Sequence, residues 1–211
     1  MPGVVNFTSS TPDDARAVAA RATDAGARYL DGRIMVPVPL VGTSDGFYLC
    51  AGDASVYEEH AAAFAALGGQ SDLLGEDHGL AALHDLAMLD VFFSGMTSFL
   101  HAAALAGVNG VPADTFLPYA RRVLTVLDHT LAGLARDVDR GSYPGEEDNL
   151  VMDLAALEHV VDASAAAGID TTVPAVARDL AAAAVERGHG ADGWSRVVEL
   201  LHQPGRAMST E

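Results

Sequence analysis

One aspartate lies inside a long apolar stretch, and its chemistry raises the first functional question. The stretch Gly79–Leu105 contains no proline and reads GLAALHDLAMLDVFFSGMTSFLHAAAL. Helical spacing places Asp85 on one face with Leu89, Phe92, Met96 and Phe99. Burial disfavours the charged form of a carboxyl, so such a group can hold a proton near neutral pH, as a general acid needs. Asp85 is therefore our candidate catalytic residue. The open alternative is a structural carboxyl that is hydrogen-bonded to a neighbouring helix.

A second polar stripe follows another face of the same stretch, at Asp90, Ser94, Thr97 and His101. The spacing does not decide whether this stripe is structural or functional, and His101 fits a core or interface histidine better than a base. Eight histidines are scattered along the chain without an H-E-x-x-H motif or a cysteine pair, so we expect no metal site.

The elements that position these residues are of two kinds. Before the long helix, the pattern alternates between strand and helix, which is typical of an α/β layer. We expect strands at 3–10 (with Val4–Phe7 as its buried part), 27–30, 47–50 and 71–74, an extended segment at 34–40, a helix from Pro12 to Gly26 capped by Thr11, and a helix from Asp53 to Gly68. After it, we expect only helices, near 113–140, 147–167, 173–187 and 193–202.

Composition excludes several function classes. The formal net charge is −17, all twelve basic residues are arginines, and there is no basic stripe, so a nucleic-acid partner is not expected. The absence of lysine excludes lysine Schiff-base chemistry. One cysteine, Cys50, suits a reducing cytoplasm. The first residues lack the features of a signal peptide, and no run of 18 apolar residues occurs, so we expect no membrane span.

The long helix also predicts an oligomer. A helix that is apolar all round must be buried all round, in a large core or between subunits. The apolar surface of 79–105 is too large for a monomer of 211 residues to cover, so we expect a homodimer.

Several stretches resemble the imine reductases and reductive aminases, which are NADPH-dependent relatives of the β-hydroxyacid dehydrogenases. These stretches are VVNFTSSTPDDARAVAARATDAGARYLDGRIMVPVPLVGT, LGEDHGLAALHDLAML, AGID and GHGADGWSRVVELL, and they cover roughly residues 3–202. The resemblance implies a mainly α fold with a truncated Rossmann-like α/β remnant at 1–77, a long connecting helix at 78–106, a helical dimerisation domain at 107–203 and a tail at 204–211. It further implies an intertwined dimer, with the active site between the cofactor domain of one subunit and the helical domain of the other.

The resemblance also assigns roles to residues. The family's catalytic acid on the long helix falls on Asp85, and the tyrosine that reductive aminases often carry two turns later is Phe93 here. Thr8, Ser9, Met35 and Pro37 correspond to remnants near the nicotinamide end. The candidate substrate-binding residues are Met35, Pro37, Leu89, Phe92, Phe93 and Met96.

The glycine loop that holds the cofactor's pyrophosphate has no counterpart at the start of the sequence. A match to its pattern at Gly188–Gly193 follows an alanine-rich helix rather than a strand, so we reject it. We therefore expect no cofactor, and a cofactor-independent acid/base enzyme that uses Asp85 for a cyclisation, isomerisation or elimination of a small molecule such as an amine or imine. Two alternatives remain open: an NADPH-dependent imine reductase present as a fragment or completed in trans, and a non-catalytic dimeric binding protein.

Overall fold

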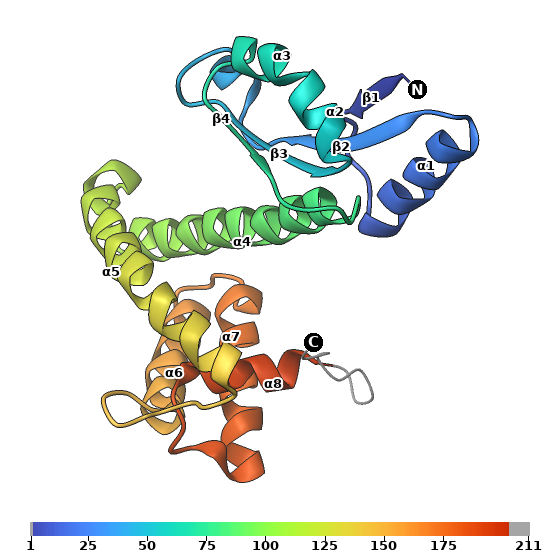
Figure 1. Cartoon of the computed structure of the whole chain (residues 1–211). Coiled ribbons are helices and arrows are strands. Elements are labelled where there is room, and N and C mark those ends of the chain that lie inside the picture. Colours follow the sequence, from blue (N-terminus) through green and yellow to red (C-terminus); the bar gives the residue numbers. More distant parts are fainter. Residues whose placement is uncertain (1, 203–211) are drawn as a thin grey trace. The chain divides into compact units, whose positions relative to one another are not determined.

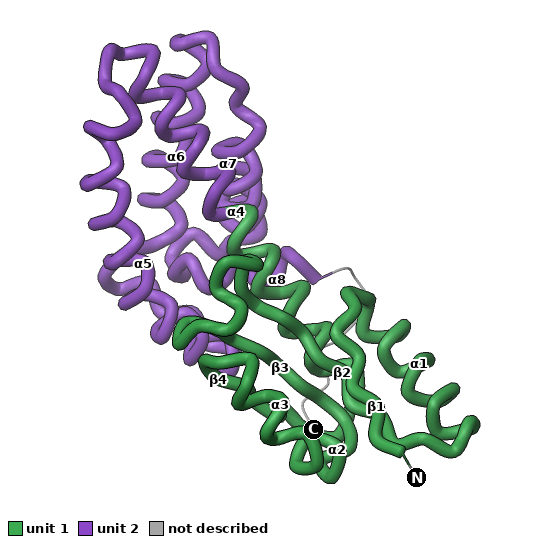
Figure 2. Tube along the Cα trace, turned by 90° about the horizontal axis from the view of Figure 1, so that it is seen from above, with its two compact units in different colours: residues 1–94 green, residues 95–211 purple. Residues whose placement is uncertain are grey.

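The computed structural model describes residues 2–202 of this chain (Figure 1). The elements in chain order are β1 (Gly3–Asn6), α1 (Pro12–Asp24), β2 (Arg28–Ile34), the 3₁₀ turn η1 (Val38–Leu40), β3 (Phe47–Gly52), α2 (Ala54–Glu59), α3 (Ala61–Ala66), β4 (Gln70–Leu73), α4 (Leu80–Val108), α5 (Ala113–Arg140), α6 (Leu150–Ala166), α7 (Thr172–Ala184), η2 (Val185–His189), η3 (Trp194–Val197) and α8 (Val198–Leu201). The chain forms two compact units, unit 1 (residues 1–94) and unit 2 (residues 95–211), which Figure 2 colours separately. The division falls inside α4.

Unit 1 contains a four-stranded mixed sheet in the order β1-β2-β3-β4. β1 runs parallel to β2, β2 antiparallel to β3, and β3 parallel to β4. In the antiparallel pair, Asp31 lies opposite Ala51 and Arg33 opposite Leu49. Because residues directly opposite each other share a face, Asp31 and Arg33 lie on the same side of the sheet as Leu49 and Ala51.

Each face of this sheet has its own core. On one side, Leu30 and Cys50 pack with Val56 of α2 and Phe64 of α3. On the other side, Leu49 and Ala51 pack with Ala81, in the first turn of α4, and with Met35. The start of α4 therefore covers the face that carries Asp31 and Arg33.

Two local features fix the helices around this face. The Thr11 hydroxyl accepts a hydrogen bond from the Asp14 amide, and the Asp14 carboxylate accepts one from the Thr11 amide, which is a capping box at the start of α1. The Arg16 guanidinium donates two hydrogen bonds of 2.8 and 2.9 Å to Asp77, whose carboxylate also accepts from the Gly79 amide. Arg16 and the Gly79 amide lower the pKa of Asp77 to about 2. These contacts join α1 to the turn from which α4 begins.

Unit 2 has a helical core of its own. Leu150 of α6 packs with Ala181 and Ala184 of α7 and with Val197 of η3. The Asn149 side chain accepts a hydrogen bond from the Met152 amide and caps α6. Gly141 adopts a left-handed conformation with φ of 59° and ends α5. The mostly helical second half expected from the sequence is therefore confirmed.

Three local expectations are wrong. The strand expected at 27–30 runs on to Ile34, and the segment expected to be extended ends in the turn Val38–Leu40. Proline is tolerated at the first positions of a helical turn, where its missing N–H is not needed, so Pro37 and Pro39 do not prevent the turn. The helix expected from Asp53 to Gly68 is divided at His60, whose φ of −102° and ψ of 11° depart from helical values. The tail expected at 204–211 lies outside the described residues.

The helix α4 exposes most of its apolar side chains. Its buried residues are Ala81, Ala82 and Asp85, whereas Val91 is 72% exposed and Phe92 and Phe93 are each 58% exposed. By length and composition alone, α4 could also cross a membrane. That is weak evidence, because the core helix of a soluble protein passes the same test. The expected absence of a membrane span therefore stays a prediction.

Candidate functional site

Asp85 is a buried charged residue of α4 and meets a charged partner from the sheet. It is 9% exposed, and its Oδ2 lies 3.7 Å from Nε of Arg33. The sequence places Asp85 among apolar neighbours of its own helix and does not reveal this arginine.

The partner of Asp85 is itself half of a buried ion pair. Arg33 is 2% exposed and Asp31 is fully buried. Nη2 of Arg33 lies 3.0 Å from Oδ2 of Asp31, and Nη1 donates a hydrogen bond of 3.2 Å to Oδ1. Strand alternation explains the arrangement, since residues i and i+2 of β2 point to the same face of the sheet.

A polar network extends from this pair toward β1. The Tyr29 hydroxyl lies 3.4 Å from Oδ1 of Asp31 and accepts a hydrogen bond of 2.8 Å from Nδ2 of Asn6. Burial raises the pKa of Asp31 against the opposing effect of Arg33, and burial also raises the pKa of Tyr29. Asn6, Tyr29, Asp31, Arg33 and Asp85 therefore form one continuous polar cluster in unit 1.

Sequence reasoning missed Asp31 and Arg33. A signal was present, because β2 reads RYLDGRI and places an acid and a base two residues apart in an otherwise buried strand. Two such residues on the buried face of a sheet are rarely tolerated unless they pair. The pairing of Arg33 with Asp85 has no equivalent signal, because the two lie 52 positions apart.

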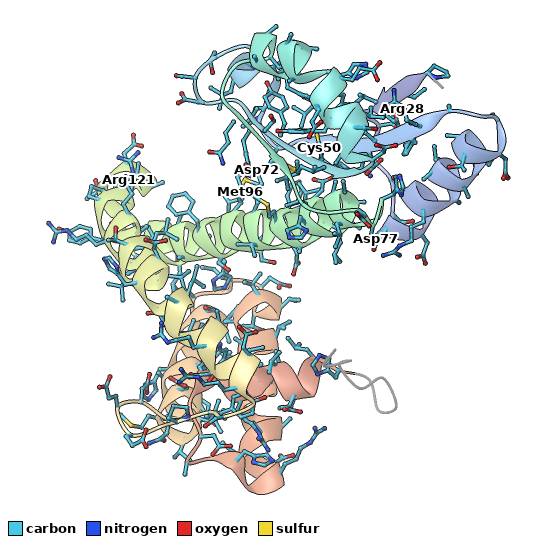
Figure 3. The ribbon with its side chains drawn as sticks, viewed as in Figure 1. Arg28, Cys50, Asp72, Asp77, Met96 and Arg121 are labelled. Carbon is cyan, nitrogen blue, oxygen red and sulfur yellow. The ribbon has the colours of Figure 1, made fainter. Side chains whose placement is uncertain are left out.

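Cys50 lies on the opposite face of the sheet, within the α2–α3 core (Figure 3). Burial and then the charge of Asp31 raise the pKa of its thiol to about 12. The thiol therefore stays protonated at neutral pH and is a packing residue rather than a nucleophile.

The predicted substrate-binding residues are divided between core and surface. Met35 packs against Leu49, Ala51 and Ala81, one turn of α4 before Asp85. Pro37 is exposed at the start of η1. The α4 residues all lie on the exposed part of the helix, with Leu89 and Met96 each 38% exposed and Phe92 and Phe93 each 58% exposed. Their role in binding stays a prediction.

Phe92 also lines a surface hollow of about 450 Å³ together with His84, Ala87, Met88 and Val91. Nδ1 of His84 lies 2.8 Å from the Leu80 carbonyl oxygen. His84 and Asp85 are sequence neighbours on one helix and therefore point in different directions. His84 is thus not the partner of Asp85.

The other polar stripe of α4 makes one contact within the helix and one with the segment before α7. The Ser94 hydroxyl lies 3.4 Å from Oδ1 of Asp90. In unit 2, Nε2 of His101 lies 3.2 Å from the carbonyl oxygen of Asp170, at the start of α7. His101 is thus in contact with a helix end, as a structural histidine would be.

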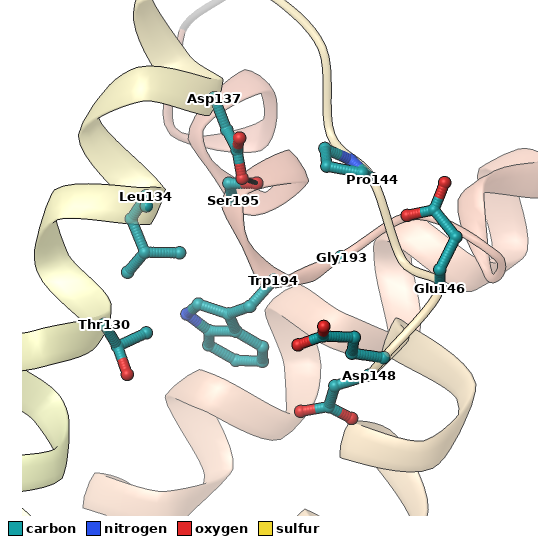
Figure 4. A pocket seen from close by; sticks show the side chains of 11 residues that line it. Thr130, Leu134, Asp137, Pro144, Glu146, Asp148, Gly193, Trp194 and Ser195 are labelled. Carbon is teal, nitrogen blue, oxygen red and sulfur yellow. Dashed lines mark hydrogen bonds between the residues drawn. The ribbon is translucent and has the colours of Figure 1, made fainter.

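A second hollow lies within unit 2 and has a volume of about 440 Å³. Figure 4 shows Trp194 between the end of α5 and the loop that carries Asp148. The hydroxyl of Ser195, the residue after Trp194, donates a hydrogen bond of 3.0 Å to Asp137 of α5. Burial, followed by the charge of Asp148, raises the pKa of nearby Asp153 to about 6. Within the described residues, no group of three or more His, Cys, Asp or Glu side chains could hold a metal ion.

The described residues do not fit the phosphate groups of a dinucleotide cofactor. The connection from β1 to α1 contains no glycine, and α1 begins with Asp13 and Asp14, which repel an anion at a helix N-terminus. The glycine-rich segment 188–193 follows α7 rather than a strand, which confirms the rejection of that motif.

Comparisons with known proteins agree on one family. Residues 77–203 match the model of the NADPH-dependent reductive aminase-like C-terminal domain. The chain is 32% identical to an NADPH-dependent reductive aminase of Aspergillus oryzae over 201 residues, which is 94% of this chain and 68% of the relative.

Solved structures extend the match to nearly the whole chain. An imine reductase of Streptomyces aurantiacus superposes with a TM-score of 0.90 at 34% identity, over 95% of this chain and 70% of that one. An imine reductase of Bacillus cereus gives 0.88 at 37% identity, over 94% and 69%. A reductive aminase of Aspergillus terreus, in complex with NADPH4, cyclohexanone and allyl amine, gives 0.88 at 34% identity, over 95% and 70%.

Proposed function

Because this chain belongs to the family of NADPH-dependent reductive aminases and imine reductases, we propose that it provides the amine-binding half of an enzyme that reduces carbon–nitrogen double bonds. The relatives favour this function over the cofactor-independent cyclisation, isomerisation or elimination that heads the sequence expectations. None of the relatives described above is a cofactor-free cyclase.

The observation that carries the proposal is the placement of Asp85. It is a buried carboxyl on the helix that opens the family domain, and its side chain keeps 13% exposure. A protonated imine carries positive charge on its nitrogen, and an adjacent carboxylate stabilises that charge in a site from which water is largely excluded. We place the substrate nitrogen beside Asp85, with an amine or an imine as the substrate class.

Binding of the NADPH phosphates depends on groups outside the described residues of one chain. The β1–α1 connection lacks a phosphate cradle, so no hydride-transfer step follows from these residues. Met35 packs against the core cluster that contains Ala81, one turn of α4 before Asp85.

We also propose that the protein is an intertwined homodimer. The apolar side chains of α4 and α5 support this, since Val91 is 72% exposed, Leu100 66% and Val123 67%. Exposed apolar surface on this scale marks an interaction site. A second copy of the chain would cover these helices.

The test is a fusion in which the NADPH-binding segment of a reductive aminase relative precedes this chain. We expect the fusion to form amine from dibenz[c,e]azepine, the compound bound to an Aspergillus terreus imine reductase, with NADPH as reductant. Asp85→Asn should lower turnover by about 10²–10⁴-fold. Asp90→Asn is the matched control on the same helix, because within the described residues Asp90 accepts a long 3.4 Å hydrogen bond from Ser94. Wild-type turnover in a folded Asp85→Asn fusion would contradict the role of Asp85, and a folded fusion without turnover would contradict the proposed function.

A further inference from the structure

The four-stranded sheet of unit 1 has two outer edges, one at β1 and one at β4. The backbone N–H and C=O groups on the outer side of an edge strand are available to pair with a further strand. The two edges of this sheet differ in whether their outward groups are already bonded. This difference indicates the side on which the sheet can be extended.

The outward backbone groups of β1 belong to Gly3 and Val5. The Arg28 amide donates a hydrogen bond of 2.9 Å to the Pro2 carbonyl, and the residues whose backbone groups face the neighbouring strand alternate along a parallel ladder. Val4 therefore directs its backbone groups to β2, as Pro2 does, whereas Gly3 and Val5 direct theirs away from it. Within the described part of the chain, these outward groups form no hydrogen bond with another segment.

The outer edge of β4 is already covered by a side chain. The Gln70 amide donates a hydrogen bond of 2.9 Å to the Gly46 carbonyl, on the β3 side, so the same alternation directs the backbone groups of Ser71 outward. The Tyr57 hydroxyl of α2 donates a hydrogen bond of 2.7 Å to the Ser71 carbonyl, and the Tyr57 ring stacks on Phe64 with their centroids 5.0 Å apart. A further strand at β4 would have to displace this hydroxyl, so β1 offers the open edge.

The side chains of β1 also lack cover toward the outer edge. Val4 pairs in register with Tyr29, so the two side chains lie on the same face of the sheet. Tyr29 is 3% exposed, whereas Val4 is 42% exposed. Asn6 lies on this face as well and donates a hydrogen bond to the Tyr29 hydroxyl. A strand beside β1 would cover Val4 and would border, at Asn6, the polar cluster that contains Asp85.

The relatives supply the occupant of this edge. The reductive aminase of Aspergillus oryzae aligns with 94% of this chain, which covers 68% of the relative. Because residues 77–203 match a C-terminal domain, the part of the relative without a counterpart here precedes the matched part. The β1–α1 connection lacks a phosphate cradle, so binding of the NADPH phosphates would fall to that preceding part.

We propose that the outer edge of β1, and not that of β4, is the docking edge for a strand of the NADPH-binding segment. This inference rests on the proposed function for the identity of the segment. The added strand pairs with the outward backbone groups of Gly3 and Val5, covers Val4 and extends the sheet of unit 1. A second copy of the chain is the competing occupant, and the test separates the two.

The test compares the chain alone with the fusion in which the NADPH-binding segment of a reductive aminase relative precedes this chain. Hydrogen exchange followed by NMR reports on single backbone amides. We expect the outward Val5 amide to exchange rapidly in the chain alone and at least about 10-fold more slowly in the fusion, because pairing with a neighbouring strand protects an amide. The Leu73 amide, which points outward from β4, is the internal control and should exchange equally in both.

A proline at this position tests the same hydrogen bond in a second way. Val5→Pro removes the outward N–H without removing a hydrogen bond to β2, and edge strands tolerate proline where the N–H faces solvent. Any strain from the fixed φ of proline is common to the chain alone and the fusion, so the chain alone is the matched control. The urea midpoint of unit 1 should fall by about 0.5 M more in the fusion than in the chain alone.

The outcomes distinguish this inference from the proposed function. A protected Val5 amide in a folded fusion without turnover supports the docking edge and counts against the proposed function. Turnover in a fusion whose Val5 amide exchanges as fast as in the chain alone overturns the inference and leaves the proposed function standing. Protection of Val5 in the chain alone that rises with protein concentration assigns the edge to a second copy and also overturns the inference.

Discussion

The Asp31–Arg33 pair gives a stability prediction whose size follows from its burial. Asp31 is fully buried and Arg33 is 2% exposed. In Arg33→Gln, the Asp31 carboxylate loses its cation, and the Thr8 and Gly32 carbonyls lose the hydrogen bonds that Nη1 donates. Removing one partner of a buried ion pair costs about 3–5 kcal/mol, which is a large part of the roughly 5–15 kcal/mol that stabilises a typical domain.

The expected loss of stability in Arg33→Gln is large enough to be measured by urea unfolding. With a urea slope of about 1–3 kcal/mol/M, Arg33→Gln should move the unfolding midpoint of unit 1 down by about 1 M or more. Hydrogen exchange at the β2 amides reports on unit 1. The single tryptophan of the chain, Trp194, lies in unit 2 and serves as an internal control whose fluorescence transition should move much less.

The double variant Asp31→Asn/Arg33→Gln tests whether the loss of stability comes from the unpaired Asp31 carboxylate. Removing both charges leaves two amides that can hydrogen-bond, so the double variant should recover about 1–3 kcal/mol relative to Arg33→Gln. A double variant as unstable as Arg33→Gln, or an Arg33→Gln variant that loses less than about 1 kcal/mol, would show that the ion pair does not support the fold as we describe.

Three further predictions concern other parts of the chain. Sedimentation at micromolar concentration should show a dimer, and Val91→Glu on the exposed face of α4 should weaken it, so a stable wild-type monomer would contradict the dimer proposal. Asp153→Asn should stabilise unit 2 by about 1 kcal/mol at pH 7.5 and not at pH 4. The sign follows because the pKa of Asp153 is raised in the folded state from 3.8 to about 6, so the wild type loses stability as the pH rises through that interval. Thr11→Ala should cost about 1 kcal/mol by removing the cap of α1, measured as a lower urea midpoint of unit 1.

Much of the local structure could be predicted because its causes are local. The Thr11 cap, the proline at the first position of α1, and Gly141 at the end of α5 each act within one helical turn, and the helices begin and end where these residues predict. The error at Pro37–Leu40 has a local cause as well. Proline excludes the interior of a helix but not its first turn, so the two prolines did not distinguish an extended segment from a 3₁₀ turn.

The site was predicted only in part, for a different physical reason. Helical spacing and the family resemblance nominate Asp85 as a candidate, because they concern one helix, and its role stays a prediction. The surroundings of Asp85 depend on which face of β2 meets the start of α4, and that is set by the antiparallel pairing of β2 with β3. Sequence reasoning read Ala27–Leu30 as a strand that stopped before Asp31, so it had no register from which to place Arg33.

Arg33, which the sequence analysis did not identify as a partner of Asp85, changes the chemistry that we propose for Asp85. A carboxyl surrounded only by Leu, Phe and Met would lower its free energy by keeping a proton, and would then suit a general acid. In the structure this carboxyl lies 3.7 Å from the guanidinium of Arg33 instead, so a role as an anion that attracts a cation becomes the alternative. Because protonation makes the imine nitrogen positive, a negative charge beside it favours the protonated imine, which accepts a hydride more readily than the neutral imine does. The register of one strand, which brings Arg33 to Asp85, therefore bears directly on the role that we propose for Asp85.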